Sequence, residues 1–293
     1  MSLTNDELIF FNALGEYLNS KNIKSFLVGG CVRDLLLKYQ VKDFDVMLEA
    51  DATKILAELY DFQDFSYHCS KPIIFKKYKT AKVVFSRVEK DFSIALDFSS
   101  ARKEVYPEVA ANPICEPGNF QQDLARRDFT INALAYSLFP LDINSPIDLF
   151  DGLTDLSEKR IRVLHDLSFR DDPARIIRAA RFVSRFGFSL DSKTEELLIQ
   201  ARINKYPNSL PDRRIYDELR KALVEDTWKE TLSYLSEREV LSLFSPELSW
   251  AWGKNTEMIF GDTWIERLEK LALCLSDLEA SELNIKFGLK NAR

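Results

Sequence analysis

The sequence contains few of the residues that build disulfide or zinc sites. It has two histidines in 293 residues. Its four cysteines are scattered, with no Cys-x-x-Cys pair: Cys31, Cys69, Cys115 and Cys274. A disulfide framework, a zinc site or a histidine-based metal site is therefore not expected. With 46% hydrophobic and 29% charged residues, the composition is that of an ordinary globular protein with enough apolar material for a core.

Long apolar runs are also missing. No stretch is long enough to span a bilayer, so no membrane partner is expected. Residues 1–12 lack the basic and then apolar pattern of a secretory signal, and they lack the Arg- and Ser-rich composition of a transit peptide. The sequence therefore predicts a cytoplasmic protein.

An excess of positive charge, which is typical of nucleic-acid-binding proteins, is absent. Forty Lys and Arg residues stand against 46 Asp and Glu residues, for a net charge of −6. The basic residues are nevertheless clustered. One cluster, at 71–90, is interleaved with Phe75, Tyr78 and Phe85, and a second runs over 170–185. Because salt screens charges beyond about 8–10 Å, such local patches can bind phosphates on an acidic chain.

Strand and helix patterns alternate in the first half of the sequence, and strand patterns fade after about residue 149. Helices are expected at 5–20, 31–38 and 52–59, strands at 25–28 and 43–48, two or three further strands within 73–97, and a loop at 107–119. In the second half the patterns predict helices at 172–188, 192–203, 212–225, 227–235 and 263–276. We therefore expect an α+β first domain followed by a helical region, with the boundary near 150.

A glycine pair lies between an expected strand and an expected helix. Gly29 and Gly30 would let the backbone approach a ligand closely, and the helix start would offer free N–H groups to a phosphate. Arg33 adds a forked donor for phosphate oxygens. Since many strand–helix turns contain glycines, this turn alone is weak evidence for a function.

Two aspartates follow on the next expected strand. Asp43 and Asp45 project from the same face of this strand. Phe44 and Val46, which alternate with them, face the core. Side-by-side carboxylates repel, and a divalent cation such as Mg²⁺ is the natural counter-charge. Asp97 lies on another apolar strand, where it could complete the site as a ligand or general base, or could simply be an acid at a strand end.

A compact charged group, Arg126, Arg127 and Asp128, precedes an apolar anchor at 129–135. Its arginines could bind a triphosphate, and its aspartate could accept a hydrogen bond from a ribose hydroxyl. A helix cap with a surface ion pair is the structural alternative.

A fourth group has arginines at helical spacing. Asp172 suits an N-cap and Pro173 a first helical position. The arginines then share one helix face: Arg175, Arg178, Arg181 and Arg185. Anions must lie opposite such a face. We favour phosphates as these anions over the alternative of a surface helix with ordinary ion pairs. Asp172 and Arg175, one turn apart, offer an acceptor and a forked donor that can read the edge of a base.

Five motifs come in the order seen in class II tRNA nucleotidyltransferases. This family includes CCA-adding, CC-adding and A-adding enzymes, and bacterial poly(A) polymerases are similar to it. The resemblance covers roughly 26–223, and its motifs are Gly29-Gly30-Cys31-Val32-Arg33-Asp34, Asp43-Phe44-Asp45, Arg126-Arg127-Asp128, Asp151-Gly152-Leu153-Thr154-Asp155 and Asp171-Asp172-Pro173-Ala174-Arg175. Each motif is weak, but five in order are specific. Departures are Lys79, where the family has glycine, Asp171, where many members have Glu, and a short C-terminal region.

The resemblance implies a polymerase-β-like nucleotidyltransferase head with a mixed sheet over 1–149. A helical neck over 150–210 and a helical body over 211–293 would follow. The chain stops without a clear terminal element, which leaves open whether a C-terminal portion is missing.

The resemblance also implies roles for single residues. Asp43 and Asp45 would hold Mg²⁺. The residues that would contact the nucleotide are Gly29, Gly30, Arg33, Arg126, Arg127 and Asp128 for triphosphate and ribose, Asp172 and Arg175 for the base, and Arg178 and Arg181 in support.

The activity implied is template-independent, Mg²⁺-dependent addition of CMP, AMP or both, from CTP and ATP, to the 3′ end of tRNA. The motifs do not distinguish CC, A or full CCA addition, nor do they indicate an oligomeric state. A poly(A) polymerase is the alternative enzyme, although its Gly-Arg-Arg-Phe run is absent from the sequence. A non-catalytic RNA-binding relative is the alternative outside the enzyme class.

Overall fold

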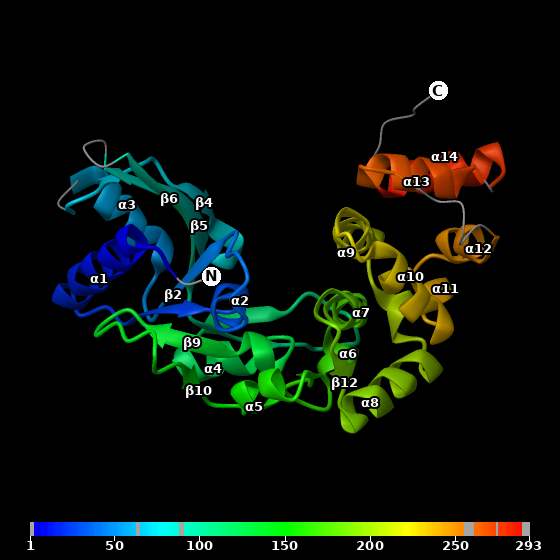
Figure 1. The fold of residues 1–293 in the computed structure, drawn as a ribbon, viewed down its shortest axis with the longest axis horizontal. Helices are drawn as coiled ribbons and strands as arrows, with labels where there is room; N and C mark the ends of the chain where they lie inside the picture. Colours follow the sequence, from blue (N-terminus) through cyan, green and yellow to red (C-terminus); the bar gives the residue numbers. More distant parts are fainter. Residues whose placement is uncertain (1–2, 63–64, 88–90, 255–260, 274, 289–293) are drawn as a thin grey trace. The chain divides into compact units, whose positions relative to one another are not determined.

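The computed structural model describes residues 3–62, 65–87, 91–254, 261–273 and 275–288 (Figure 1). The chain divides into two compact units. The first comprises Met1–Val105 and Ile114–Glu158, and the second comprises Tyr106–Pro113 and Lys159–Arg293. Each unit has its own core, and the two are described in turn.

The first unit is built on an eight-stranded mixed sheet in the order β10-β9-β1-β2-β6-β5-β3, with β4 also paired to β5. The pair β2·β6 is parallel and the other pairs are antiparallel. The strands are β1 (Ser25–Val28), β2 (Phe44–Leu48), β3 (His68–Cys69), β4 (Ile73–Phe75), β5 (Thr80–Arg87), β6 (Phe92–Ser100), β9 (Leu134–Ser137) and β10 (Ile147–Asp148). The mixed sheet expected of an α+β first domain is confirmed.

Helices α1 (Asn5–Ser20) and α3 (Ala52–Phe62) lie along one face of this sheet (Figure 1). A capping box formed by Thr4 and Glu7 starts α1, because the two side chains satisfy backbone N–H groups that have no partner within the helix. The buried face of α1 then packs aromatic rings on the strands. The ring of Phe10 lies 5.3 Å from that of Phe85 on β5, and Phe11 lies 5.1 Å from Phe44 on β2. Residues that alternate with the core residues along these strands are left on the opposite face.

The remaining helices of the first unit are α2 (Gly30–Leu36), α4 (Phe120–Ala125) and α5 (Gly152–Ser157). The unit runs past the boundary expected near 150 because α5 packs on it. Thr130 donates a hydrogen bond to Asp155 at 2.6 Å, and a Cβ on Gly152 would meet the Thr130 carbonyl oxygen at 2.4 Å. The backbones are therefore in contact there.

The expected loop at 107–119 is partly wrong, because β8 (Ile114–Pro117) pairs with β7 (Arg102–Val105) as a two-stranded ribbon. Lys103 and Glu116 are cross-strand partners that form an ion pair at 2.8 Å. Such long-range pairing is absent from local sequence patterns. Between the two strands, Tyr106–Pro113 belongs to the second unit, where the Ala110 N–H donates to the Arg170 carbonyl at 3.0 Å.

The second unit is helical, apart from a two-stranded parallel pair of β11 (Arg160–Ile161) and β12 (Ser189–Leu190). Its helices are α6 (Ser168–Asp171), α7 (Ala174–Phe186), α8 (Ser192–Ile203), α9 (Asp212–Val224), α10 (Trp228–Glu237), α11 (Leu241–Phe244), α12 (Pro246–Lys254), α13 (Trp264–Ala272) and α14 (Asp277–Lys286). The expected helical second half is confirmed. The division into neck and body at 210 stays a prediction.

Within the described residues, no helix is both long enough and apolar enough to cross a membrane. In the part of the chain that the structure describes, Cys31, Cys69 and Cys115 form no disulfide bond. Cys274 and the last residues of the basic cluster at 71–90 lie outside the described residues.

Gly15 in α1 provides a test of the first unit's packing. A Cβ at this position would lie 1.9 Å from the Leu138 carbonyl oxygen, whereas a Cβ on Gly253 in α12 would meet nothing within 4 Å. Replacing a helical glycine by alanine normally stabilises by up to about 1 kcal/mol, but overpacking costs about 1–3 kcal/mol. We expect Gly15→Ala to lower the melting temperature and Gly253→Ala to raise it slightly. A Gly15→Ala protein as stable as Gly253→Ala would contradict the close approach of α1 to Leu138.

Candidate active site

The sheet brings two of the predicted carboxylates side by side. Asp45 on β2 and Asp97 on β6 are direct partners in the parallel register. Asp43 immediately precedes β2. Phe44 and Val46, which flank Asp45, are buried on the core side, as expected. Asp45 and Asp97 therefore lie on the sheet face that α1 and α3 leave uncovered.

Asp45 is the electrostatic centre of this cluster. Burial raises its pKa to about 6, and the charges of Asp97 and Asp43 add to the shift, whereas Arg127 opposes it. The charged form of Asp45 is therefore disfavoured mainly by burial and further by repulsion from its acidic neighbours.

The donors suit a divalent cation whose coordination is completed by other oxygens. In the described part of the chain, no group of three or more His, Cys, Asp or Glu side chains could hold a metal ion by itself. Asp97 is instead paired with Lys82, whose Nζ lies 2.8 Å from its Oδ2. Asp43 and Asp45 remain as two candidate oxygen ligands, and Mg²⁺ typically takes one or two carboxylates together with waters and substrate phosphates.

The turn after β1 places an arginine beside these carboxylates. Gly29 has φ 80° and ψ −138°, a conformation that glycine adopts without strain. A Cβ at this position would lie 2.6 Å from Arg127 Nη1 and 3.7 Å from Asp45 Oδ2. The missing side chain therefore makes room for the Arg127 guanidinium next to Asp45. Helix α2 begins at Gly30, one residue before its predicted start at Cys31.

Arg33 is buried rather than open to a ligand, at 4% exposure. Its guanidinium donates to Asp34 Oδ1 at 2.9 and 2.8 Å and to Asn132 Oδ1 at 2.6 Å. Asn132 in turn donates to Asp128 Oδ1 at 2.8 Å. Arg33 and Asp128 thus belong to one buried network, joined through Asn132, a residue for which no role was predicted. Their contacts with triphosphate and ribose stay predictions.

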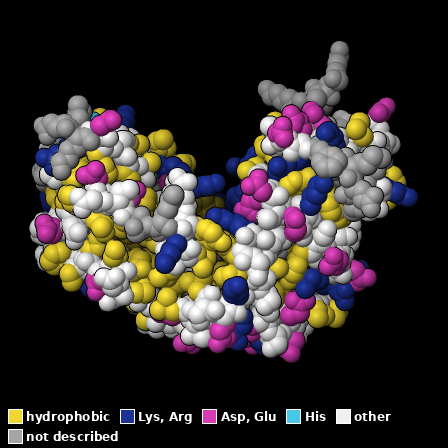
Figure 2. All heavy atoms as spheres, viewed as in Figure 1, with side chains coloured by type: hydrophobic (Ala, Val, Ile, Leu, Met, Phe, Trp, Pro, Cys, Tyr) yellow, Lys and Arg dark blue, Asp and Glu magenta, His cyan; other side chains and the backbone are white. Residues whose placement is uncertain are grey.

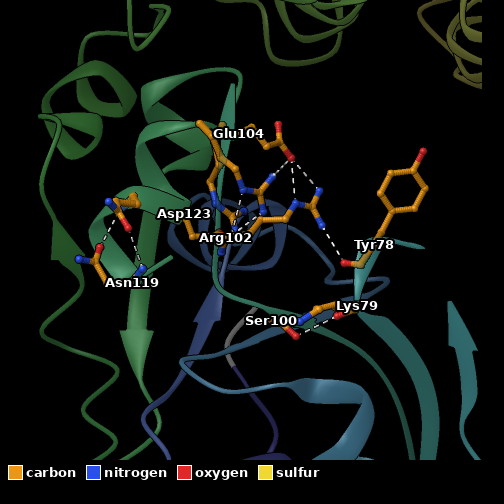
Figure 3. Close-up of polar contacts among 10 residues, drawn as sticks. Tyr78, Lys79, Ser100, Arg102, Glu104, Asn119 and Asp123 are labelled. Atoms are coloured by element: carbon orange, nitrogen blue, oxygen red, sulfur yellow. Dashed lines mark hydrogen bonds and ion pairs between the residues drawn. The ribbon is translucent and has the colours of Figure 1, made fainter. Parts of the chain in front are cut away.

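Two buried carboxylates, Asp123 and Glu104, hold the arginine pair at the end of α4. Figure 3 shows both carboxylates together with Arg102. Asp123, with no exposed surface, accepts from Arg126 at 2.6 Å through Oδ1 and from Arg127 at 3.1 Å through Oδ2. Burial alone would raise the pKa of Asp123, but the two guanidinium groups outweigh it and lower the pKa. Arg126 also donates to Glu104, which accepts from Arg102 as well.

Arg127 retains donor capacity in this arrangement. Its Nε is buried and has no hydrogen-bond partner among the described residues. Buried donors are almost always paired, so this atom is a candidate for a bond to a ligand oxygen. Asp123 positions Arg127 but was not singled out from the sequence, since its role depends on the turn after α4.

In the second unit, Asp172 and Arg175 are buried, at 7% and 3% exposure. The helix α7 starts at Ala174, one residue after the first helical position expected at Pro173, and Asp172 accepts from the Ala174 N–H at 3.1 Å. Arg175 donates to Ser168 Oγ at 2.7 Å, and its Nε lies 4.0 Å from Asp172 Oδ2. Arg214 of α9 lies 2.6 Å from Asp172 Oδ1, a partner that sequence spacing could not predict.

The anions opposite the α7 arginines include carboxylates of the protein. Arg178 donates to Glu218 at 3.2 Å, and Arg181 donates to Glu218 at 3.1 Å and to Glu225 at 2.6 Å. Glu218 lies in the middle of the packed helix α9, and Glu225 directly follows that helix. Ion pairs within the fold therefore account for two of the arginines, and contact of this helix face with phosphates stays a prediction. Basic and acidic side chains are likewise intermingled over the visible surface of this unit (Figure 2).

Comparison with known proteins first defines the class of the first unit. Residues 25–162 match the family described as the poly(A) polymerase head domain. The matched range includes Asp43, Asp45 and Asp97, and also the arginine pair after α4.

The relatives then define the family. Over 272 residues the chain is 36% identical to the A-adding tRNA nucleotidyltransferase of Aquifex aeolicus, covering 91% of this chain and 30% of that protein. It is 36% identical over 219 residues to the enzyme of the same name from Halalkalibacterium halodurans, covering 74% and 49%. A solved structure of a CCA-adding enzyme with ATP superposes with a TM-score of 0.75 at 30% identity, covering 99% of this chain and 67% of that one. The chain belongs to the class II tRNA nucleotidyltransferase family, and it spans half or less of the length of these two curated relatives.

Glu218 provides a test of the second unit's ion pairs. Burial would raise its pKa, but Arg178, Lys221 and Arg181 together lower it from 4.5 to about 2. Because the folded pKa is depressed, this carboxylate stabilises the fold above pH of about 4.5, and the stabilisation is lost as the pH falls toward 2. The shift corresponds to roughly 3 kcal/mol.

We therefore expect Glu218→Gln to lower the free energy of unfolding at pH 7, and expect its deficit relative to wild type to shrink at pH 3. Urea unfolding at both pH values measures this, with the exposed Glu237→Gln as the matched control. A deficit that is the same at both pH values would show that the charge of Glu218 is not what stabilises the unit.

Proposed function

We propose that this chain adds CMP, AMP or both, from CTP and ATP, to the 3′ end of tRNA without a template and with release of pyrophosphate. The observation that carries the proposal is the pairing of Asp45 with Asp97 beside Gly29 and Arg127, in a chain of this family. Enzymes of the family generally use a divalent metal ion. We propose Mg²⁺, held by Asp43 and Asp45, and a cytoplasmic location.

In this proposal, the bound ion would lower the pKa of the RNA 3′-hydroxyl and stabilise the departing pyrophosphate. The protein's own contribution is to position the reactants. Arg127 binds triphosphate oxygens through its unpaired Nε, while Asp123 fixes its other end. Asp97 lies beside Asp45, where it can orient the attacking hydroxyl.

Asp172 and Arg175 select the nucleotide. A carboxylate can accept from the exocyclic amine of C or A, and a guanidinium can donate to the adjacent ring acceptor, whereas U and G present the opposite pattern. Ser168 and Arg214 support the assignment, because they hold both side chains in fixed positions. A fixed pair can replace a template, since its donors and acceptors do not readjust to a wrong base.

Poly(A) polymerase activity is the alternative reaction, and RNA binding without catalysis is the alternative outside the enzyme class. The similarity to A-adding enzymes makes addition of the terminal A a specific candidate for the product.

Extension of tRNA transcripts tests these possibilities together. Transcripts ending at the discriminator base, at CC and at CCA are incubated with Mg²⁺ and CTP, ATP or both. Addition that stops at CCA supports the proposal, and the transcript extended identifies CC, A or full CCA addition. Long tails from ATP alone on unstructured RNA would indicate a poly(A) polymerase. Binding of tRNA with no incorporation would support the non-catalytic alternative.

Asp43→Ala is expected to lower incorporation by at least a thousandfold, because one of two metal ligands is lost, while the melting temperature stays within about 1 °C, since Asp43 is exposed. Asp61→Ala, an exposed aspartate on α3, is the control and should retain full activity. Normal incorporation by Asp43→Ala would refute the assigned metal ligand.

Arg175→Lys keeps the charge but removes the planar fork. We expect the preference for CTP and ATP over UTP and GTP to fall by roughly tenfold or more, because a bidentate contact is worth about 1–3 kcal/mol of discrimination. Binding of tRNA should change much less. Single-nucleotide incorporation kinetics measure this, with Arg202→Lys on α8 as the control. If the preference is unchanged in Arg175→Lys, the base is read elsewhere.

A further inference from the structure

Lys82 is a cation that the fold places against the catalytic carboxylates. On β5 it is the direct antiparallel partner of Asp97 on β6, and its Nζ donates to Asp97 Oδ2 at 2.8 Å. Its neighbours Ala81 and Val83 are buried on the core side, so Lys82 projects from the same face as Asp45 and Asp97. The side chain of Lys82 is 58% exposed and that of Asp97 31% exposed.

Strand register extends this pair into a row. Because Asp97 is paired with Lys82 on one side and with Asp45 on the other, the three residues lie across adjacent strands. The hydrogen bond to Asp97 raises the pKa of Lys82, and the charges of Asp97, Asp43 and Asp45 act in the same direction. The ammonium group thus stays charged at neutral pH and interacts with all three carboxylates.

The row borders open space. A cavity of about 250 Å³ in the first unit is lined by Asp43, Lys82 and Asp97, with Ser70 and Lys71 from the neighbouring segment. An ion that enters this cavity to reach Asp43 therefore meets the Lys82 ammonium group as well.

We propose that Lys82 is a resident counter-cation of the Asp43–Asp45–Asp97 cluster that weakens divalent metal binding to the nucleotide-free protein. The inference rests on the metal site of the proposed function. Asp97 cannot turn an oxygen fully toward an incoming ion while it accepts from Lys82, and the ammonium charge repels that ion. A nucleotide triphosphate supplies the negative charge that offsets Lys82, so the ion is held firmly once the nucleotide is present.

Two opposite effects of removing Lys82 can be compared. Lys82 also restrains the Asp97 carboxylate, and losing that restraint would weaken metal binding by about fivefold at most, given the entropy of one short side chain. Repulsion between the Lys82 charge and a dication a few ångströms away weakens metal binding by more than this, even with the high effective dielectric constant near a surface. The net result is tighter binding without Lys82.

The test is an Mn²⁺ titration of the full chain without nucleotide, followed by electron paramagnetic resonance of free Mn²⁺. Lys82→Met and Lys82→Gln should bind Mn²⁺ about tenfold more tightly than wild type. Lys82→Arg, which keeps the charge, should stay within about twofold. Lys79→Met is the matched control, since Lys79 precedes the same strand and pairs with Asp51 at 3.4 Å instead. Unchanged or weaker Mn²⁺ binding by both uncharged variants would overturn the inference.

Asp43→Ala separates this result from a failure of the proposed function. If Asp43→Ala binds Mn²⁺ as wild type does, the assigned metal site itself is wrong. If Asp43→Ala loses the ion but the uncharged Lys82 variants bind it no better than wild type, the metal site stands and only the role of Lys82 is refuted.

Discussion

The constraint on which the first unit depends is the repulsion among carboxylates gathered on one face of its sheet. Asp45 is largely buried beside Asp97 and Asp43, so its charged form requires positive charge nearby. The surrounding structure supplies it from two directions. Arg127 approaches over Gly29, and Lys82 approaches across β6. Three features meet this requirement for positive charge near Asp45. They are the positive φ of Gly29, the strand register of Lys82 and the buried Asp123 that holds Arg127.

The second unit also gathers like charges, in this case the arginines of one helix, and pairs them with side chains of a neighbouring helix. Its arginine-rich helix α7 packs against α9, and Glu218 and Arg214 of α9 meet Arg178, Arg181 and Asp172. Removing one partner of a buried ion pair destabilises the fold, because it leaves a buried charge unpaired, so these pairs fix the positions of their side chains. Both units therefore hold candidate ligand-binding side chains with groups of opposite charge, so that little reorganisation is needed when a ligand arrives.

The parts of this site that could be predicted from the sequence are those set by local geometry. Alternation along one strand places Asp43 and Asp45 on one face, and a glycine pair between a strand and a helix indicates a tight turn. The partnership of Lys82 with Asp97 depends on strand register, which joins residues far apart in the chain and has no local signal. Arg214 and Glu218 were missed for the same reason, since only the packing of α9 on α7 brings them to Asp172 and Arg178. The arginine face itself was recognised, but helical spacing cannot show whether carboxylates or phosphates lie opposite it.

The path of the chain around 106–113 has a consequence for dissecting the protein. The flanking strands β7 and β8 belong to the first unit, whereas Tyr106–Pro113 belongs to the second, where Ala110 bonds to Arg170. The polypeptide therefore passes from one unit to the other at 105/106, 113/114 and 158/159. A gene fragment ending at 158 would encode 106–113 without the residues they pack on, and a fragment starting at 159 would lack them. The units are thus not modules that a single cut can separate, and shuffling one of them into another protein would require replacing this segment as well.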